Sequence, residues 1–217
     1  MKLHILYEDN HVIAAIKPPN VLSQADSSGD ADMLTIIKGY IKEKYSKPGD
    51  VYLGLVHRLD RPASGVMIFA RTSKAASRLS NEIRNGRMQK VYLAVTSRIP
   101  PQDEGELTGY IKKSNGNSKI CEKGEEGAKE ARLKFKVLNK KDGMALIKVD
   151  LLTGRHHQIR VQFASIGCPL VGDMRYGQGE KYKLALFCSQ LIVKHPTKEE
   201  MLNISSKVPD VYPFNLF

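Results

Sequence analysis

Residues 57–70 read HRLDRPASGVMIFA: a cluster of charged side chains, a tight connection and then an unbroken apolar run. The run Gly65–Ala70 is bounded by turn-forming residues, which predicts a strand buried on both faces. Pro62 and Ser64 favour a short turn before this strand. Polar residues held at the mouth of a rigid strand are a common location for functional sites. This stretch is therefore the first candidate site.

Asp60 lies between two arginines, Arg58 and Arg61. Guanidinium groups within contact range keep a carboxylate ionised and lower its pKa by about 1–3 units. An ionised, preorganised carboxylate can act as a nucleophile or a base. The alternative is a surface ion-pair cluster that contributes about 0–1 kcal/mol to stability. The spacing alone leaves both interpretations open.

A second group of chemically active side chains occupies residues 153–160, TGRHHQIR. It follows an alternating strand and leads into a predicted helix, and a helix N-terminus attracts phosphate and other anions. Arg155 and Arg160 add forked donors suited to phosphate or carboxylate. His156 and His157 invite a metal site, but adjacent residues do not share a helix face and no acidic partner lies at ligand spacing. We therefore expect an anion site and no metal.

Tyr92 stands in the alternating segment KVYLA, residues 90–94, on the strand face opposite Val91 and Leu93. A tyrosine in this position is commonly a half-buried sheet residue. Its ring can instead be offered to a nucleic-acid base, since such stacking contributes about 1–3 kcal/mol. No GxxxxGK[ST], GxGxxG or GxSxG motif occurs in the chain, so nothing indicates a phosphate loop or a hydrolase elbow.

The composition is that of a folded, basic protein. The 217 residues include 34 Lys+Arg and 23 Asp+Glu, a formal net charge of +11. This excess favours nucleic acid as a partner, although many proteins are basic merely for solubility. No apolar run is long enough to span a membrane and no signal peptide is recognisable. Three cysteines without a CxxC pair suit a reducing compartment, so we expect a cytoplasmic protein without disulfides.

The remaining patterns predict a mixture of strands and helices. Asp32 and Ser73 are expected to cap two helices, and a third is expected over about 157–165. Residues 112–130 are polar and rich in Lys, Gly, Asn and Glu, which predicts a mobile loop. Apolar alternation predicts strands in 3–16 (a hairpin), 91–95, 131–137, 145–151 and 184–193. Without strict βαβ alternation, this argues for an α+β fold with a largely antiparallel or mixed sheet, in one domain over 1–217.

Taken in order, these segments resemble the RluA family of pseudouridine synthases. The resemblance is strongest at HRLDRPASGV and covers nearly the whole chain. The matching segments are Tyr7-Glu8-Asp9, Lys17-Pro18-Pro19, 57–66, 90–94, LLTGRHHQIRVQF at 151–163, PLVGDMRYG at 169–177, Leu184-Ala185-Leu186 and Lys194-His195-Pro196. The family fold is an α+β domain with a long central mixed or antiparallel sheet, flanking helices and an active cleft across its middle.

The resemblance implies an RNA pseudouridine synthase. Such an enzyme breaks the N-glycosidic bond of a chosen uridine in RNA, rotates the uracil and joins C5 to C1′, without a metal or organic cofactor. By motif, Asp60 would be the catalytic carboxylate, either attacking C1′ or taking a proton from C2′. Tyr92 would stack on the target uracil and assist proton removal at C5. Arg160 would pair with Asp60.

The same resemblance implies which residues contact RNA. Arg58 would fill the gap left by the flipped nucleotide, because an enzyme acting on a stacked base must extrude it at a cost of a few kcal/mol. His57, Arg61, Arg155 and His157 would add to the RNA-binding surface. Ribosomal and transfer RNA both remain open as substrates, as do the uridine position and the number of sites. A monomer is the plain expectation.

The sequence departs from the family pattern in two places. Pro62-Ala63 stand where Asp-Thr is common, and Phe187-Cys188 stand where His-Ala is common. The catalytic segments begin almost at Met1, so we expect no N-terminal RNA-binding module. We expect the surface of the catalytic domain to select the substrate, with a contribution from the polar segment 112–130.

Two other functions compete with the isomerase. One is a non-catalytic RNA-binding protein on the same fold, which the presence of Asp60, Tyr92 and Arg160 argues against. The other is a hydrolase or nuclease using Asp60 with His57 or His157, but the second carboxylate usual in such sites is lacking.

Overall fold

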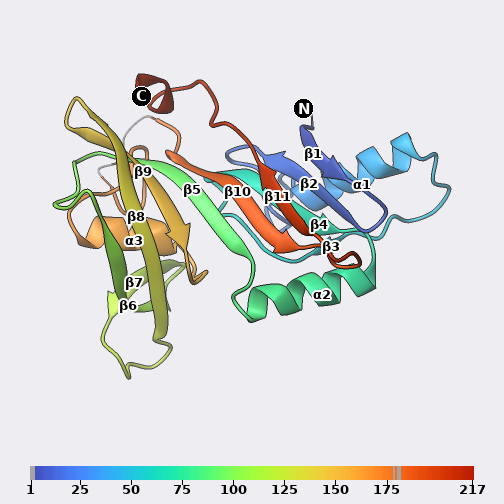
Figure 1. Cartoon of the computed structure of the whole chain (residues 1–217), viewed down its shortest axis with the longest axis horizontal. Helices are drawn as coiled ribbons and strands as arrows, with labels where there is room; N and C mark the ends of the chain where they lie inside the picture. The colour runs from blue at the N-terminus through green and yellow to red at the C-terminus, as the bar shows by residue number, and fades with distance from the viewer. Residues whose placement is uncertain (1–2, 178, 180–181) are drawn as a thin grey trace. The chain divides into compact units, whose positions relative to one another are not determined.

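The computed structural model describes residues 3–177, 179 and 182–217 (Figure 1). Its contacts divide the chain into two compact units. Unit 1 takes the chain up to Met88 together with Gln190–Ser206, and unit 2 comprises Gln89–Ser189 and Lys207–Phe217. Both units combine antiparallel strands with helices, so the α+β class is confirmed. The single domain over 1–217 stays a prediction.

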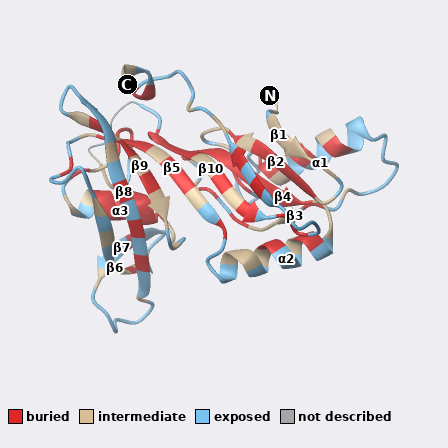
Figure 2. Ribbon diagram, in the orientation of Figure 1, coloured by how far each residue is buried: buried red, intermediate tan, exposed pale blue. Residues whose placement is uncertain are grey.

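Unit 1 is built on the strand that follows the charged cluster. This strand, β4 (Ser64–Ala70), is buried along its whole length, as its apolar run predicts (Figure 2). Its antiparallel partner β2 (Val12–Lys17) pairs in turn with β1 (Ile5–Glu8), which confirms the predicted N-terminal hairpin. The other strands of this unit are β3 (Gly54–Leu55) beside β4, β11 (Met201–Ser205) beside β10, and β10 (Leu186–Lys194) itself from Gln190 onward.

Two helices of unit 1 begin within one residue of their predicted caps. Helix α1 (Met33–Lys44) is capped by Asp32, whose carboxylate accepts a backbone N–H of the first turn at 3.1 Å. Helix α2 (Ser73–Arg84) is capped by Thr72 and not by Ser73, because the Thr72 hydroxyl accepts a first-turn N–H at 3.2 Å. The prediction of Ser73 as the cap of α2 is therefore wrong by one residue.

Unit 2 contains antiparallel strands, the helix α3 (Gln158–Ser165) and a short 3-10 helix, η1 (Phe214–Leu216). The predicted helix over about 157–165 is therefore confirmed. Val149 of one central strand and Phe163 of the helix are both fully buried and form part of this unit's core. The strands, in their order across the sheet, are β5 (Gln89–Thr96), β9 (Met144–Leu151), β8 (Lys129–Lys141), β6 (Glu104–Ser114) and β7 (Asn117–Cys121).

The prediction of a mobile loop over 112–130 is wrong. Strand β6 runs to Ser114, turns at Asn115–Gly116 into β7, and β8 already begins at Lys129. Both turn residues have positive φ, 48° and 74°, as a tight two-residue hairpin requires. The polar composition reflects strands with a water-exposed face, which composition alone does not distinguish from a loop.

Within the residues that the structure describes, no helix has the length and apolar character needed to cross a membrane.

Candidate active site

Asp60 lies, partly buried, in the loop that joins β3 to β4. Its carbonyl accepts the N–H of Ala63 at 3.1 Å, which closes the tight turn predicted from Pro, Ser and Gly. On the other side, the hydroxyl of the buried Ser23 donates to the carbonyl of Leu59 at 2.9 Å and accepts its N–H at 3.2 Å. The backbone is therefore fixed by hydrogen bonds on both sides of the carboxylate.

Lys17, the last residue of β2, is fully buried beside this loop. Its ammonium donates to the carbonyl of Arg61 at 2.9 Å and to that of Pro18 at 3.0 Å. Burial lowers the pKa of Lys17 to about 7, and the negative charge of Asp60 partly opposes that shift. The sequence marked Lys17 only as part of a motif, whereas the structure makes it a support of the residue that follows Asp60.

The other charged residues of the cluster divide into one buried and two exposed side chains. His57 is buried, and its Nε2 accepts the backbone N–H of Ile68 in β4 at 3.1 Å, so it holds the loop against the strand. Arg58 and Arg61 are exposed, and Arg61 forms an ion pair with Asp30 at 2.6 Å. Contacts of these three residues with RNA stay predictions.

Tyr92 lies in the middle of β5, opposite Val149 of β9 in the sheet register. Its side chain is 6% exposed, so it is buried and not half-buried. Lys90 lies two residues earlier on the same face and is partly exposed. A stacking role for Tyr92 stays a prediction.

Arg160 is buried in α3 and forms a two-pronged ion pair with Asp173. Its Nε and one Nη each donate to a different carboxylate oxygen at 2.8 Å. Asp173 also accepts the backbone N–H groups of Arg175 at 3.0 Å and Tyr176 at 3.1 Å. Burial raises the pKa of Asp173, but the hydrogen bonds and charge of Arg160 and these amides together shift it downward. The pair is thus ionised and rigidly oriented.

The sequence led us to predict an ion pair between Arg160 and Asp60, and it gave no role to Asp173. Asp60 and Arg160 belong to different units, and their ion pair stays a prediction. The signal for Asp173 was the segment 169–177, which was used only as one of the segments that carry the family resemblance.

Tyr176 connects the start of α3 to β7. Its hydroxyl accepts the N–H of Ser118 at 2.8 Å and lies 2.8 Å from Nδ1 of His157. Its ring centroid is 5.1 Å from the guanidinium carbon of Arg160. The rings of His156 and His157 stack at 3.7 Å. His157 is thus packed inside unit 2, and its predicted contact with RNA stays a prediction.

The loop before α3 is closed by the side chain of Gln158. Its Oε1 accepts the hydroxyl of Thr153 at 2.8 Å and the N–H of Arg155 at 3.0 Å. Arg155 is partly exposed, and its Nε donates to the carbonyl of Glu130 at 2.7 Å. The loop backbone is therefore held by its own helix and by β8.

Comparison with known proteins places this fold and these motifs among RNA-modifying isomerases. Residues 11–165 match the family model of RNA pseudouridylate synthase. The ribosomal large subunit pseudouridine synthase C of Rickettsia bellii is 28% identical over 216 residues, 96% of this chain and 69% of the relative. An uncharacterized RNA pseudouridine synthase of Bacillus subtilis is 30% identical over 213 residues, again 96% of this chain and 69% of the relative.

A solved structure, human RNA pseudouridylate synthase domain containing 4, shares the fold. Its TM-score is 0.80 at 22% identity, and the match covers 95% of this chain and 88% of that one. This chain belongs to the RNA pseudouridylate synthase family and is an RNA pseudouridine synthase, an isomerase. The family resemblance drawn from the motifs is confirmed.

Proposed function

We propose that this enzyme converts one or more specific uridines of ribosomal or transfer RNA to pseudouridine, with Asp60 as the catalytic carboxylate and no metal or organic cofactor. The observation that carries the proposal is the fixed loop around Asp60, bonded to Ser23 on one side and Lys17 on the other. A carboxylate that must meet the sugar of a flipped nucleotide requires such preorganisation.

The reaction needs three roles in addition to binding. Asp60 either attacks C1′, which displaces uracil and forms a covalent sugar ester, or removes a proton from C2′. In both cases uracil leaves as an anion and turns in place. In the first case its C5 then displaces the Asp60 carboxylate from C1′, and in the second its C5 bonds to C1′ of the unsaturated sugar while Asp60 returns the proton to C2′. Tyr92 stacks on the uracil and assists loss of the C5 proton, and Arg160 keeps Asp60 ionised by its charge.

The target uridine must leave its stack before it reaches the carboxylate. Extruding a nucleotide costs a few kcal/mol, and a side chain that fills the vacated space offsets part of that cost. Arg58, exposed two residues before Asp60, supports this role by its position. His57, Arg61, Arg155 and His157 complete the proposed contacts with RNA.

The first substrate to test is ribosomal RNA, because the Rickettsia relative is named for the large ribosomal subunit. Activity in the cytoplasm fits the three free cysteines. A monomer is the simplest assembly.

Release of tritium from RNA labelled at uridine C5 tests the activity without knowledge of the target, because forming the C5–C1′ bond expels that hydrogen. The RNA is taken from cells lacking this protein and separated into ribosomal and transfer fractions. We expect release from one fraction. Tight binding to both fractions with no release from either would instead support a binding protein, and cleavage of the RNA would support a nuclease.

A further inference from the structure

Lys90 is a cation in unit 2 that the proposed mechanism does not use. It lies on β5, two residues before Tyr92 and on the same face. Burial lowers the pKa of Lys90, and the opposing contribution of Cys188 is smaller. Among the residues that the structure describes, none forms a hydrogen bond or ion pair with its ammonium group. A partly buried cation without a counter-ion is unfavourable unless a ligand supplies the charge.

Gly154 leaves the space in front of this ammonium open. A Cβ at position 154 would lie 3.7 Å from Nζ of Lys90, so a larger side chain would extend over it. The backbone of Gly154 does not have positive φ, and turn geometry therefore does not require a glycine there. The absence of a side chain instead gives access to Lys90.

The loop that carries Gly154 keeps its conformation without Lys90. The N–H of Thr153 donates to the carbonyl of Arg132 at 3.1 Å, and Nε2 of Gln158 donates to the same carbonyl at 3.1 Å. With the bonds of Gln158 to Thr153 and Arg155, the loop is fixed on both sides of Gly154. Lys90 thus has no part in holding the loop.

We propose that Lys90 and the backbone of Gly154 form a subsite for one phosphate of the RNA chain, a proposal that rests on the function proposed above. Phosphate is the anion that every RNA substrate carries, and an ammonium is a common phosphate ligand. Side chains two residues apart on a strand face are separated by about 6.7 Å. One nucleotide spans that distance, so the phosphate belongs to the nucleotide whose base stacks on Tyr92 or to its neighbour.

The test is the binding of fluorescein-labelled oligouridylate at several salt concentrations to wild type and to Lys90→Met. Methionine retains the length of the side chain and removes only the charge, so the melting temperature should not fall. We expect affinity to weaken about tenfold, ~1.4 kcal/mol. We also expect the slope of log affinity against log salt to become shallower by about 0.7, one phosphate contact to a single strand.

Matched variants separate this subsite from a general effect of charge. Lys38→Met removes one charge from an exposed position on α1 and should leave both affinity and slope as in wild type. Lys90→Arg keeps the charge and should restore most of the binding. Gly154→Val alone should weaken RNA binding. In the double variant with Lys90→Met it should weaken binding little further, because both changes block the same contact.

Wild-type affinity and slope in Lys90→Met would overturn the subsite, whether or not the enzyme isomerises uridine. Equal losses in Lys90→Met and Lys38→Met would do the same. If oligouridylate binding depends on Lys90 but no RNA fraction releases tritium, the proposed function fails while the subsite stands.

Discussion

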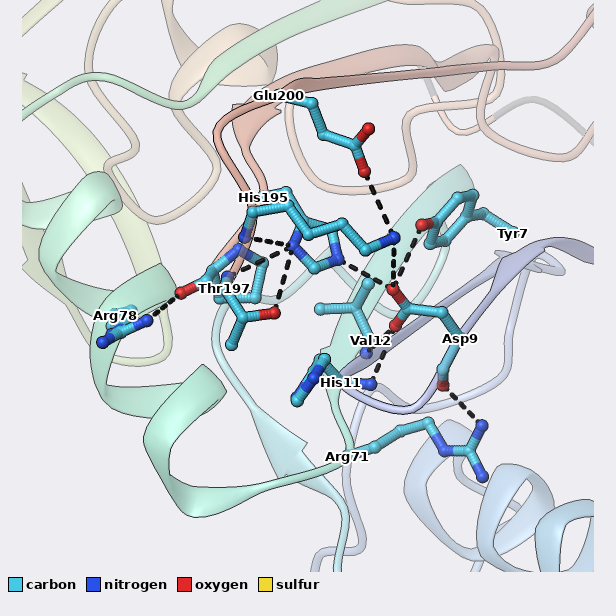
Figure 3. A network of polar contacts seen from close by, with 11 residues as sticks. Tyr7, Asp9, His11, Val12, Arg71, Arg78, His195, Thr197 and Glu200 are labelled. Carbon is cyan, nitrogen blue, oxygen red and sulfur yellow. Dashed lines mark hydrogen bonds and ion pairs between the residues drawn. The ribbon is translucent and has the colours of Figure 1, made fainter.

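His195 donates its Nε2–H to a carboxylate oxygen of Asp9 at 2.8 Å (Figure 3). Asp9 lies in the turn between β1 and β2, and His195 lies in the turn between β10 and β11. The tautomer follows from the other nitrogen, since Nδ1 accepts the backbone N–H groups of Thr197 and Lys198, each at 3.1 Å. Asp9 also accepts the N–H of His11 at 2.8 Å. This network fastens the start of the chain to the β10–β11 turn.

The Asp9 network predicts loss of stability in acid. Burial raises the pKa of Asp9, but the hydrogen bonds it accepts outweigh that effect and depress its pKa strongly. A carboxylate with a depressed folded pKa contributes stability above its unfolded pKa, about 3.9, and that stability is lost as the pH falls below it. Thermal unfolding of wild type and Asp9→Asn between pH 6 and 3 measures this, because the variant should lose less. An equal loss of melting temperature in wild type and Asp9→Asn would contradict the lowered pKa of Asp9.

Lys17 predicts a second dependence of stability on pH, of the same sign but in alkali. Its folded pKa, lowered by burial to about 7, lies below the unfolded value. The unfolded chain therefore binds more protons between about pH 7 and 10, and stability from this group rises with pH over that range. Urea unfolding should show the rise in wild type and not in Lys17→Met. The variant should also isomerise uridine about tenfold more slowly at unchanged RNA affinity, because the loop of Asp60 loses a support.

Variants of the Arg160–Asp173 pair distinguish its contribution to stability from its contribution to activity. Asp173→Asn leaves a buried guanidinium without its counter-charge, which should cost roughly 3–5 kcal/mol of stability. The double variant Arg160→Met/Asp173→Asn should recover much of that loss, because the buried charge is gone and the asparagine oxygen still accepts the amides of the turn. It should nevertheless remain inactive if Arg160 acts on Asp60. A stable and active double variant, by melting temperature and tritium release, would make the pair purely structural.

Tyr92→Phe is expected to keep the ring on the uracil and lose the hydroxyl. Single-turnover measurements should show normal disappearance of uridine but slower tritium release, by about 100-fold, since proton transfer at C5 comes late in the reaction. Tyr92→Leu is the control that also removes stacking and should weaken RNA binding. Normal tritium release by Tyr92→Phe would make the hydroxyl a bystander.

The sequence was most informative where one local rule dominates. The apolar run of β4 has no alternative to burial, and Asp32 has the residue type that caps a helix. The hairpin of β6 and β7 was missed because its lysine-rich composition resembles a loop, although Asn115–Gly116 is a strong hairpin signal. A polar strand is identified by its partners, which composition does not contain.

The candidate site was predicted by its motifs but not by its supports. Asp60, Tyr92 and Arg160 stand in recognisable segments. Lys17 and Asp173 became visible only through burial, since each acts on a group that folding brings to it: a carbonyl 44 residues away for Lys17, and a guanidinium 13 residues away for Asp173.

The role of Asp60 is the central claim, and Asp60→Asn tests it most directly. Asparagine preserves the size of the side chain and its acceptor oxygen, and the loop bonds to Ser23 and Lys17 involve only its neighbours. Tritium release from the RNA fraction that wild type modifies should fall to background, with RNA affinity within a few-fold of wild type. Release at the wild-type rate by Asp60→Asn would contradict the account.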